Sequence, residues 1–296
     1  MELGALRPYR HSGKFGVHAL LLAPLAGVLV GWPLGFAYAY LIKWIPFVYL
    51  NILLTLGYGA VIGLAMGATL KFCRVRSVLV AAGLALLAGV LANYFQWNGC
   101  VHALYGGAPL LCSPAGLMGA MAHLYEHGSW GTRSGGNVTG VMLALIWSGE
   151  ALTILGTAVY FGTDPIRNTP YCEKSGSWLD AETKFSTLAA FTEAAQVTAL
   201  QAGDIAPVIE ARPRPPGASV FGRLTLKYSP QCKDFFTLKV ENVTLKADKE
   251  GKVEEQAKAL TKDLVLPSEL RELVERFADL RPTVAEGTGE VSAGNG

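Results

Sequence analysis

Residues 138–161 read VTGVMLALIWSGEALTILGTAVYF, and this stretch decides the class of the protein. A helix needs roughly 20 predominantly apolar residues to cross about 30 Å of hydrocarbon, and the stretch exceeds that length. It contains one charged side chain, that of Glu150. The stretch therefore predicts a membrane-spanning helix with a single acidic group inside the bilayer.

Three further stretches are apolar and long enough to span a membrane, at about 15–42, 45–70 and 77–97. Charged residues make up only 16% of the sequence, well below the roughly 25% of a soluble domain. Residues 15–162 are therefore expected to form an α-helical bundle of four spans in contact with the lipid bilayer. A loop at 98–137 connects the third and fourth spans.

The two parts of the protein differ in charge. Residues 1–162 hold eight basic and three acidic residues, a balance of 8 − 3 = +5, and the remainder holds 25 − 8 = 17 basic and 23 − 3 = 20 acidic residues, a balance of −3. The basic residues do not gather on one element that could follow a phosphate backbone. No nucleic-acid partner is expected.

The basic residues flank the spans unevenly. Those before the first span or between the second and third are Arg7, Arg10, Lys14, Lys71, Arg74 and Arg76. The other two connections hold only Lys43 and Arg133, the latter offset by Glu126. Because basic residues stay on the cytoplasmic side of a membrane, residues 1–14 and 163–296 are expected in the cytoplasm. We expect a multi-pass protein of a bacterial inner membrane with residues 98–137 outside.

Glycines recur every four residues on the first two spans. They are Gly27, Gly31 and Gly35, followed by Gly59, Gly63 and Gly67. Helices in lipid associate through close backbone approach over such small residues. The stripes predict packing within one bundle, and the alternative is a homo-oligomer interface.

Glu150 is the most informative residue of the bundle. A charge at the centre of a membrane helix costs about 2.5–3.5 kcal/mol on insertion scales, so such residues face a partner or a water-filled cavity. One interpretation is a proton or cation site in a small transporter or channel subunit. The alternative is a protonated acid hydrogen-bonded to a neighbouring helix, with Asn51 or Asn93 as partner.

The outer loop holds its own helix signal. Ser113-Pro114 is typical of a helix start, with a capping residue followed by Pro at the first turn, and Gly128 is expected to end a helix along the membrane surface. Cys100 and Cys112 could form a disulfide in an oxidising compartment, or remain free thiols at the interface.

That helix carries His123-Leu-Tyr-Glu126-His127, which matches the H-x-x-E-H spelling of one class of zinc peptidases. Here His102 could serve as a third ligand. A surface helix with two exposed imidazoles is the favoured interpretation, because the loop is too short to form a substrate cleft. No metal site is expected.

Residues 163–282 predict a small α+β domain with an antiparallel β-hairpin or meander. Helical spacing indicates a helix over 185–200, and alternating patterns indicate strands at 219–229, 235–247 and 257–266. A turn is expected at 249–252 and an amphipathic helix from Pro267 to about 280. Residues 283–296 have no apolar pattern that would fold.

Two C-x-x-C spacings in this domain each have one Cys replaced by Ser. They are Cys172-Glu-Lys-Ser175 and Ser229-Pro-Gln-Cys232. On this spacing residues 165–250 resemble a zinc ribbon that has lost one ligand from each knuckle, and the protein as a whole resembles bacterial membrane proteins that join a few spans to a small cytoplasmic ribbon. Two thiolates and two hydroxyls hold zinc poorly, so the resemblance implies a turn without metal or cofactor.

Residues 163–296 contain no His and no convincing catalytic constellation. We therefore expect a membrane scaffold or adaptor, not an enzyme, whose cytoplasmic domain binds a protein partner. The alternatives are the transporter or channel subunit that uses Glu150 and, less favoured, a membrane metallopeptidase at the HLYEH stretch.

Overall fold

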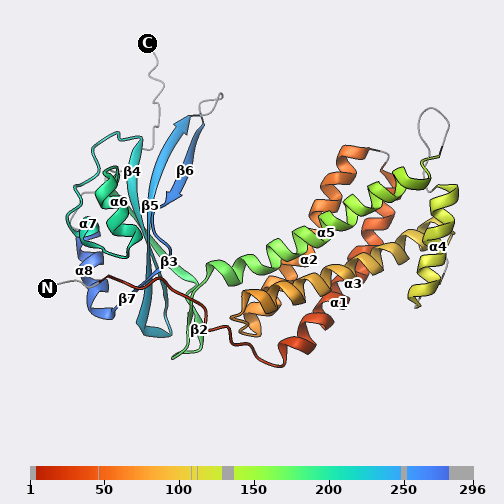
Figure 1. Cartoon of the computed structure of the whole chain (residues 1–296), viewed down its shortest axis with the longest axis horizontal. Helices are drawn as coiled ribbons and strands as arrows, with labels where there is room; N and C mark the ends of the chain where they lie inside the picture. Colours follow the sequence, from red (N-terminus) through yellow and green to blue (C-terminus); the bar gives the residue numbers. More distant parts are fainter. Residues whose placement is uncertain are drawn as a thin grey trace, which may run out of the picture. The chain divides into compact units, whose positions relative to one another are not determined.

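The computed structural model describes residues 5–279 apart from 46, 108, 112, 129–136 and 248–251. The protein divides into two compact units, drawn in Figure 1. One unit is His11–Asn168, and the other combines Met1–Arg10 with Thr169–Gly296. We call them the bundle and the sheet unit.

The bundle contains four long apolar helices. They are α1 (Ala19–Trp44), α2 (Val48–Phe72), α3 (Val78–Leu104) and α5 (Gly140–Asn168), each long and apolar enough to cross a membrane. Their outer surfaces are apolar too, since Leu21, Leu79 and Leu152 are 76%, 83% and 70% exposed. Exposed leucines on this scale require a lipid environment, and the protein is a multi-pass membrane protein.

The fourth span is longer than its apolar pattern. Helix α5 continues past Phe161 to Asn168, with Pro165 inside its last turns. Polar side chains of this extension bond within the helix: Thr163 donates to the Val159 carbonyl at 2.8 Å, and Asn168 donates to Asp164 at 2.7 Å. The bundle therefore ends at Asn168, six residues beyond the boundary expected at 162.

The short helix of the outer loop follows its sequence signals. Helix α4 runs from Pro114 to His127. The Ser113 hydroxyl caps its N-terminus by accepting a hydrogen bond from the Gly116 N–H at 3.1 Å, and Gly128, at φ 80°, ends it. Leu117 and Leu124 are buried in a cluster with Trp97 of α3. Residues 98–104, expected in the loop, instead extend α3.

The glycine stripes lie against helices of the same molecule. A Cβ added at Gly31 would lie 3.3 Å from the Ala92 Cα of α3, and one at Gly63 would lie 2.8 Å from the Ala158 carbonyl oxygen of α5. The remaining stripe residues make equally close approaches: Gly27 and Gly35 to α3, and Gly59 and Gly67 to α5. Their surfaces are thus covered within the bundle, and the alternative of a homo-oligomer interface through these stripes stays a prediction.

The sheet unit is built on an antiparallel meander. Its strands are β3 (Ala181–Ala189), β4 (Val220–Ser229), β5 (Cys232–Ala247) and β6 (Val253–Ala259), with β7 (Leu264–Leu266) also paired to β5. A separate small hairpin joins β1 (Tyr171–Cys172) and β2 (Ser177–Trp178). The expected α+β fold class and the strands β4 and β5 are confirmed.

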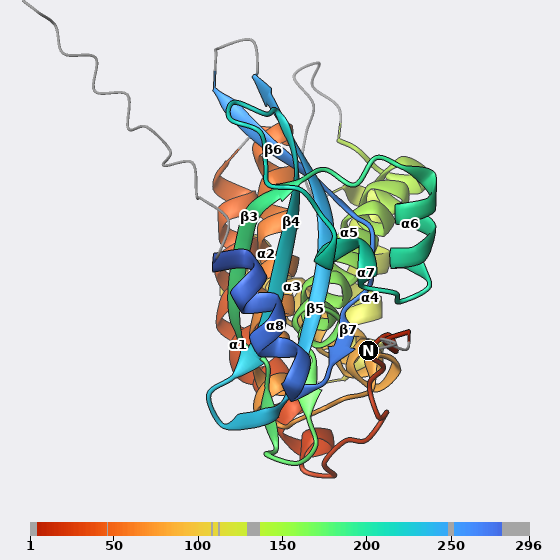
Figure 2. The ribbon, with the colours of Figure 1, turned by 90° about the vertical axis from the view of Figure 1, so that its left-hand side faces the viewer.

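Helices cover one face of this sheet (Figure 2). They are α6 (Ala194–Gln201), α7 (Ala206–Ile209) and α8 (Ser268–Asp279). The apolar face is in register across the strands, with Leu224 opposite Val240 and Leu226 opposite Leu238. These four side chains are at most 1% exposed and form one core with residues of the helices, among them Leu200, Val208 and Val274.

The expected helix over 185–200 is wrong in its first half. Residues up to Ala189 belong to β3, and α6 begins only at Ala194. Pairing with β4 overrides the helical pattern of this segment, since Phe185 lies opposite Leu224 and Leu188 opposite Gly222. The Asn242 side chain then fixes the turn after β3, accepting from the Phe191 N–H at 3.0 Å and donating to the Phe191 carbonyl at 2.8 Å.

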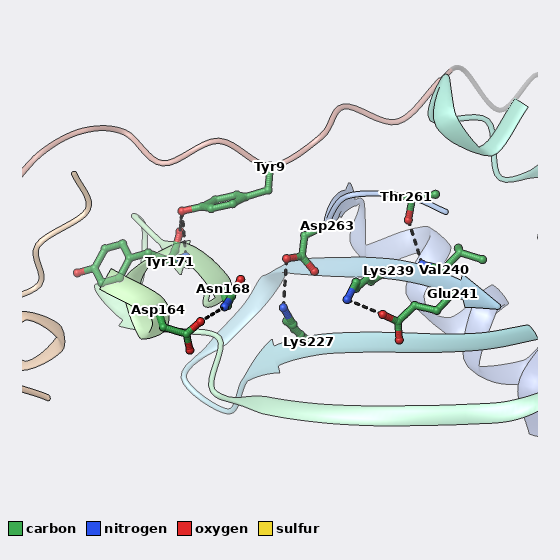
Figure 3. A network of polar contacts seen from close by, with 10 residues as sticks. All are labelled: Tyr9, Asp164, Asn168, Tyr171, Lys227, Lys239, Val240, Glu241, Thr261 and Asp263. Atoms are coloured by element: carbon green, nitrogen blue, oxygen red, sulfur yellow. Dashed lines mark hydrogen bonds and ion pairs between the residues drawn. The ribbon is translucent and has the colours of Figure 1, made fainter. Parts of the chain in front are cut away.

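The N-terminal segment belongs to the sheet unit. Pro8 forms a bridge with Leu264 of β7, and hydrogen bonds join the Val265 N–H to the Arg7 carbonyl at 2.8 Å and the Tyr9 N–H to the Asp263 carbonyl at 2.7 Å. The Tyr9 hydroxyl also accepts from the Tyr171 N–H at 3.0 Å, as drawn in Figure 3. The segments before α1 and after α5 are thus parts of one folded unit.

Candidate functional site

Glu150 lies at the centre of a polar network between the spans. It is half-buried on α5, and its Oε1 accepts a hydrogen bond from the Tyr38 hydroxyl of α1 at 2.5 Å. The same oxygen accepts a second hydrogen bond from the Gln96 Nε2 of α3 at 3.3 Å. One carboxylate oxygen therefore joins three helices.

The network continues into α2 through two side chains. The Tyr38 hydroxyl and Thr55 Oγ1 lie 2.8 Å apart. The Tyr58 ring stacks on that of Tyr38 with centroids 4.9 Å apart, and its hydroxyl donates to the Ala92 carbonyl of α3 at 2.8 Å. We call Tyr38, Thr55, Tyr58, Gln96 and Glu150 the Glu150 network; all four spans contribute to it.

Gly35 on α1 makes room for the network. A Cβ at this position would lie 2.8 Å from the Gln96 backbone nitrogen and 3.0 Å from the Tyr58 hydroxyl. Contacts below about 3.0 Å require a neighbouring atom to move, and a backbone atom cannot move alone. The glycine that brings α1 close to α3 thus also positions two network residues.

No basic side chain within the described residues pairs with Glu150. The Lys43 amine donates to the Ala103 carbonyl instead. His102 Nδ1 lies 2.9 Å from the Tyr40 hydroxyl. The carboxyl group therefore has neutral hydrogen-bond donors and no counter-charge in the part of the protein that the structure describes.

The partners of Glu150 differ from the two asparagines that the sequence suggested. Asn51 Oδ1 is buried and has no hydrogen-bond partner in the part of the chain that the structure describes, and Asn93 is half-buried on α3. Sequence reasoning missed Tyr38 and Gln96, because a phenol or an amide near a span end is also typical of the membrane interface. The one available signal was that Gln96 interrupts an apolar stretch.

The histidines of α4 do not assemble into a metal centre. His123 and His127 are exposed and their rings stack with centroids 4.2 Å apart, while His102 is engaged by Tyr40. Across the described residues, no group of three His, Cys, Asp or Glu side chains is arranged to hold a metal ion. The ligand set proposed for a metallopeptidase is not brought together.

The two Cys–Ser pairs of the sheet unit meet through a disulfide. Cys172 of β1 and Cys232 of β5 are bonded to each other and are 2% and 4% exposed. Ser175 Oγ lies 2.6 Å from Ser177 Oγ, and Ser229 Oγ accepts from the Gln231 N–H at 3.3 Å. The resemblance to a zinc ribbon is therefore not supported, since the sulfurs bond to one another and the serines bond locally.

The remaining cysteines lie in the bundle. Cys73 at the end of α2 and Cys100 in α3 form no disulfide with another cysteine of the described residues, and burial raises the pKa of the Cys73 thiol. Cys112 lies outside the described residues, so the pairing of Cys100 with Cys112 stays a prediction.

Comparison with known proteins gives no relative. No family model, no curated protein and no solved structure matches the sequence. The functional argument therefore rests on the two units themselves.

Proposed function

We propose that the protein is a membrane-anchored adaptor whose sheet unit binds a protein partner by strand addition to β6. The supporting observation is the exposure of this strand, because all seven residues of Val253–Ala259 are exposed. Within the described residues β6 pairs on one edge only, with Glu241–Ala247 of β5. Its other edge leaves backbone N–H and C=O groups free to accept a strand.

The charged side chains of β6 limit unspecific pairing at its free edge. Exposed edges invite random association, and proteins protect them with charged residues. Glu254, Glu255 and Lys258 supply such charges here. An extended peptide can still pair with the backbone, because strand addition derives its affinity from main-chain hydrogen bonds and its specificity from alternate side chains.

The rest of the sheet unit gives the strand a rigid base. Neither the core cluster nor the disulfide includes a residue of β6. Arg223 of β4 also forms an ion pair with Glu255 of β6 at 2.7 Å. In this proposal the four spans fix the sheet unit at a membrane, and β6 recruits the partner there.

Site-specific photo-crosslinking in the full-length, membrane-embedded protein tests the proposal. A photoreactive residue at Gln256 of β6 should form an adduct with a second protein, and the same residue at Thr192, exposed before α6, should not. Ala257→Pro removes an N–H on the free edge of β6 and should abolish the adduct formed from position 258, while Ala257→Ser should preserve it. Adducts that form equally at 192, or that survive the Pro substitution, would contradict strand addition.

A further inference from the structure

The Glu150 network has an unsatisfied member, and it adjoins the carboxyl group. Gln96 is 5% exposed and gives its amide N–H to Glu150, while its buried Oε1 has no hydrogen-bond partner among the described residues. Buried polar atoms are almost always paired, so an orphaned acceptor needs an explanation. The neighbouring carboxyl group suggests one, because it changes from an acceptor to a donor when it takes up a proton.

The ionised and protonated forms of Glu150 need different partners. The carboxylate accepts hydrogen bonds only, and the Tyr38 hydroxyl and the Gln96 amide N–H supply two donors to Oε1. The carboxylic acid carries an O–H that requires an acceptor. Rotation of the Gln96 amide by half a turn presents its Oε1 to that O–H and moves its N–H groups to the position that Oε1 held.

A metal cation fits this arrangement poorly. Both donors turn their hydrogens toward Oε1 of Glu150, where these hydrogens would repel a bound cation. An ionised carboxylate that pairs with no basic side chain of the described residues is also costly inside a membrane. A proton cancels that charge and needs no further oxygen ligands.

We propose that Glu150 is a reversible proton-binding site, with Tyr38 and Gln96 as the residues that hold its two protonation states. A hydronium ion gives up a proton and leaves as water, the carboxylate forms an O–H bond and becomes a neutral acid, and Gln96 changes from donor to acceptor. Release reverses both changes. Tyr38 donates to the carboxyl group in each state and keeps its position through Thr55.

The other titratable groups near Glu150 come from the helices packed against it. Helix α1 contributes Tyr38 and Lys43, α2 contributes Tyr58, and α3 contributes Cys100. On α4 the titratable side chains His123, Glu126 and His127 are exposed. Lys43 is the basic group of this set, and its amine already donates to a backbone carbonyl.

The site lies within reach of an aqueous phase. Tyr38 is 44 − 38 = 6 residues from Trp44, the last residue of α1, which is about 9 Å along the helix axis. In the proposal, a proton reaches the half-buried Glu150 from this end of α1.

Infrared difference spectroscopy of the full-length protein in lipid vesicles, between alkaline and acidic pH, tests the proposal. A carboxylic C=O band should appear on acidification and be lost in Glu150→Gln. The matched control is Glu126→Gln, the same change at an exposed site, which should retain the band. Tyr38→Phe should move the band's pH midpoint by about one unit, a tenfold change in proton affinity.

The amide signal distinguishes the Gln96 role from a merely structural one. The C=O stretch of the Gln96 amide should change together with the acid band, and both changes should disappear in Glu150→Gln. Gln96→Leu should keep the acid band but shift its frequency. A band unaffected by Glu150→Gln, or a Gln96 stretch that stays constant while Glu150 titrates, would overturn the proposal.

Discussion

Thr261 completes the hydrogen bonding of β5 at the point between β6 and β7. Its hydroxyl accepts from the Val240 N–H at 2.9 Å (Figure 3), and the two residues are 6% and 0% exposed. Thr261→Val keeps the shape but leaves a buried N–H unpaired, so we expect a loss of about 1–3 kcal/mol in unfolding free energy. Hydrogen–deuterium exchange of β5 should accelerate accordingly. Thr261→Ser, which retains the hydroxyl, should lose much less; an equal loss would mean that packing, and not the hydrogen bond, is responsible.

The Cys172–Cys232 disulfide closes a segment of 60 residues. A crosslink over this length stabilises the folded state by about 4 kcal/mol in the chain-entropy model. Mass spectrometry without reduction should find the two peptides joined, and reduction or Cys232→Ser should make the sheet unit markedly more sensitive to trypsin. Cys100→Ser, which removes a cysteine outside this crosslink, is the control and should not. Equal alkylation of Cys172 and Cys100 in the folded, unreduced protein would show that the crosslink is absent.

At the scale of elements, α2 carries two glycines with opposite surroundings. A Cβ at Gly63 would lie 2.8 Å from the Ala158 carbonyl and 2.8 Å from the Phe161 Cβ, whereas nothing lies within 4 Å of one at Gly57. Gly63→Ala should therefore separate α2 from α5 and lower the melting temperature in detergent. Gly57→Ala should be neutral or stabilising by up to about 1 kcal/mol, because alanine favours the helix. Equal effects of the two substitutions would contradict the packing described for this pair of helices.

The elements were predictable from the sequence where one physical signal dominated. Hydrophobic length identified the four spans, and Ser113 and Gly128 identified the ends of α4. The helical pattern gave the wrong prediction at β3, because the alanines around residue 190 suggest a helix. The strand that pairs with this segment, β4, lies more than 30 residues away in the sequence. Strand pairing at that separation leaves little trace in local spacing.

The Glu150 network was predictable only in part, for a related reason. Glu150 can be identified from the sequence of its own span, because it is the one charged residue in that apolar stretch. Its partners depend on which helices are neighbours, and Tyr38 lies 112 residues away in sequence. Glycine stripes predict that helices approach closely, but they do not identify which helices are neighbours. Neutral partners such as Tyr38 and Gln96 can therefore be recognised only in the assembled bundle.

At the scale of the whole molecule, the N-terminal segment and residues after α5 share one folded unit, so both must lie on one side of the membrane. The Arg76 N–H also donates to the Lys14 carbonyl at 2.8 Å, which places the basic α2–α3 connection beside the segment that precedes α1. Basic residues are therefore concentrated at the end of the bundle from which both connections to the sheet unit leave. The distribution of positive charge predicts that this end faces the cytoplasm.

The buried disulfide is the opposing signal, because disulfides are rare in reducing compartments. Labelling with a membrane-impermeant maleimide decides whether the sheet unit lies on the cytoplasmic or the opposite side. The labelling uses a background with Cys73, Cys100 and Cys112 replaced by Ser. We predict that Gly119→Cys, exposed on α4, reacts in intact cells and that Thr192→Cys, exposed in the sheet unit, reacts only after permeabilisation. The opposite pattern would place the sheet unit in the oxidising compartment and make the charge distribution the misleading signal. Reaction of both positions in intact cells would contradict a four-span bundle that separates them.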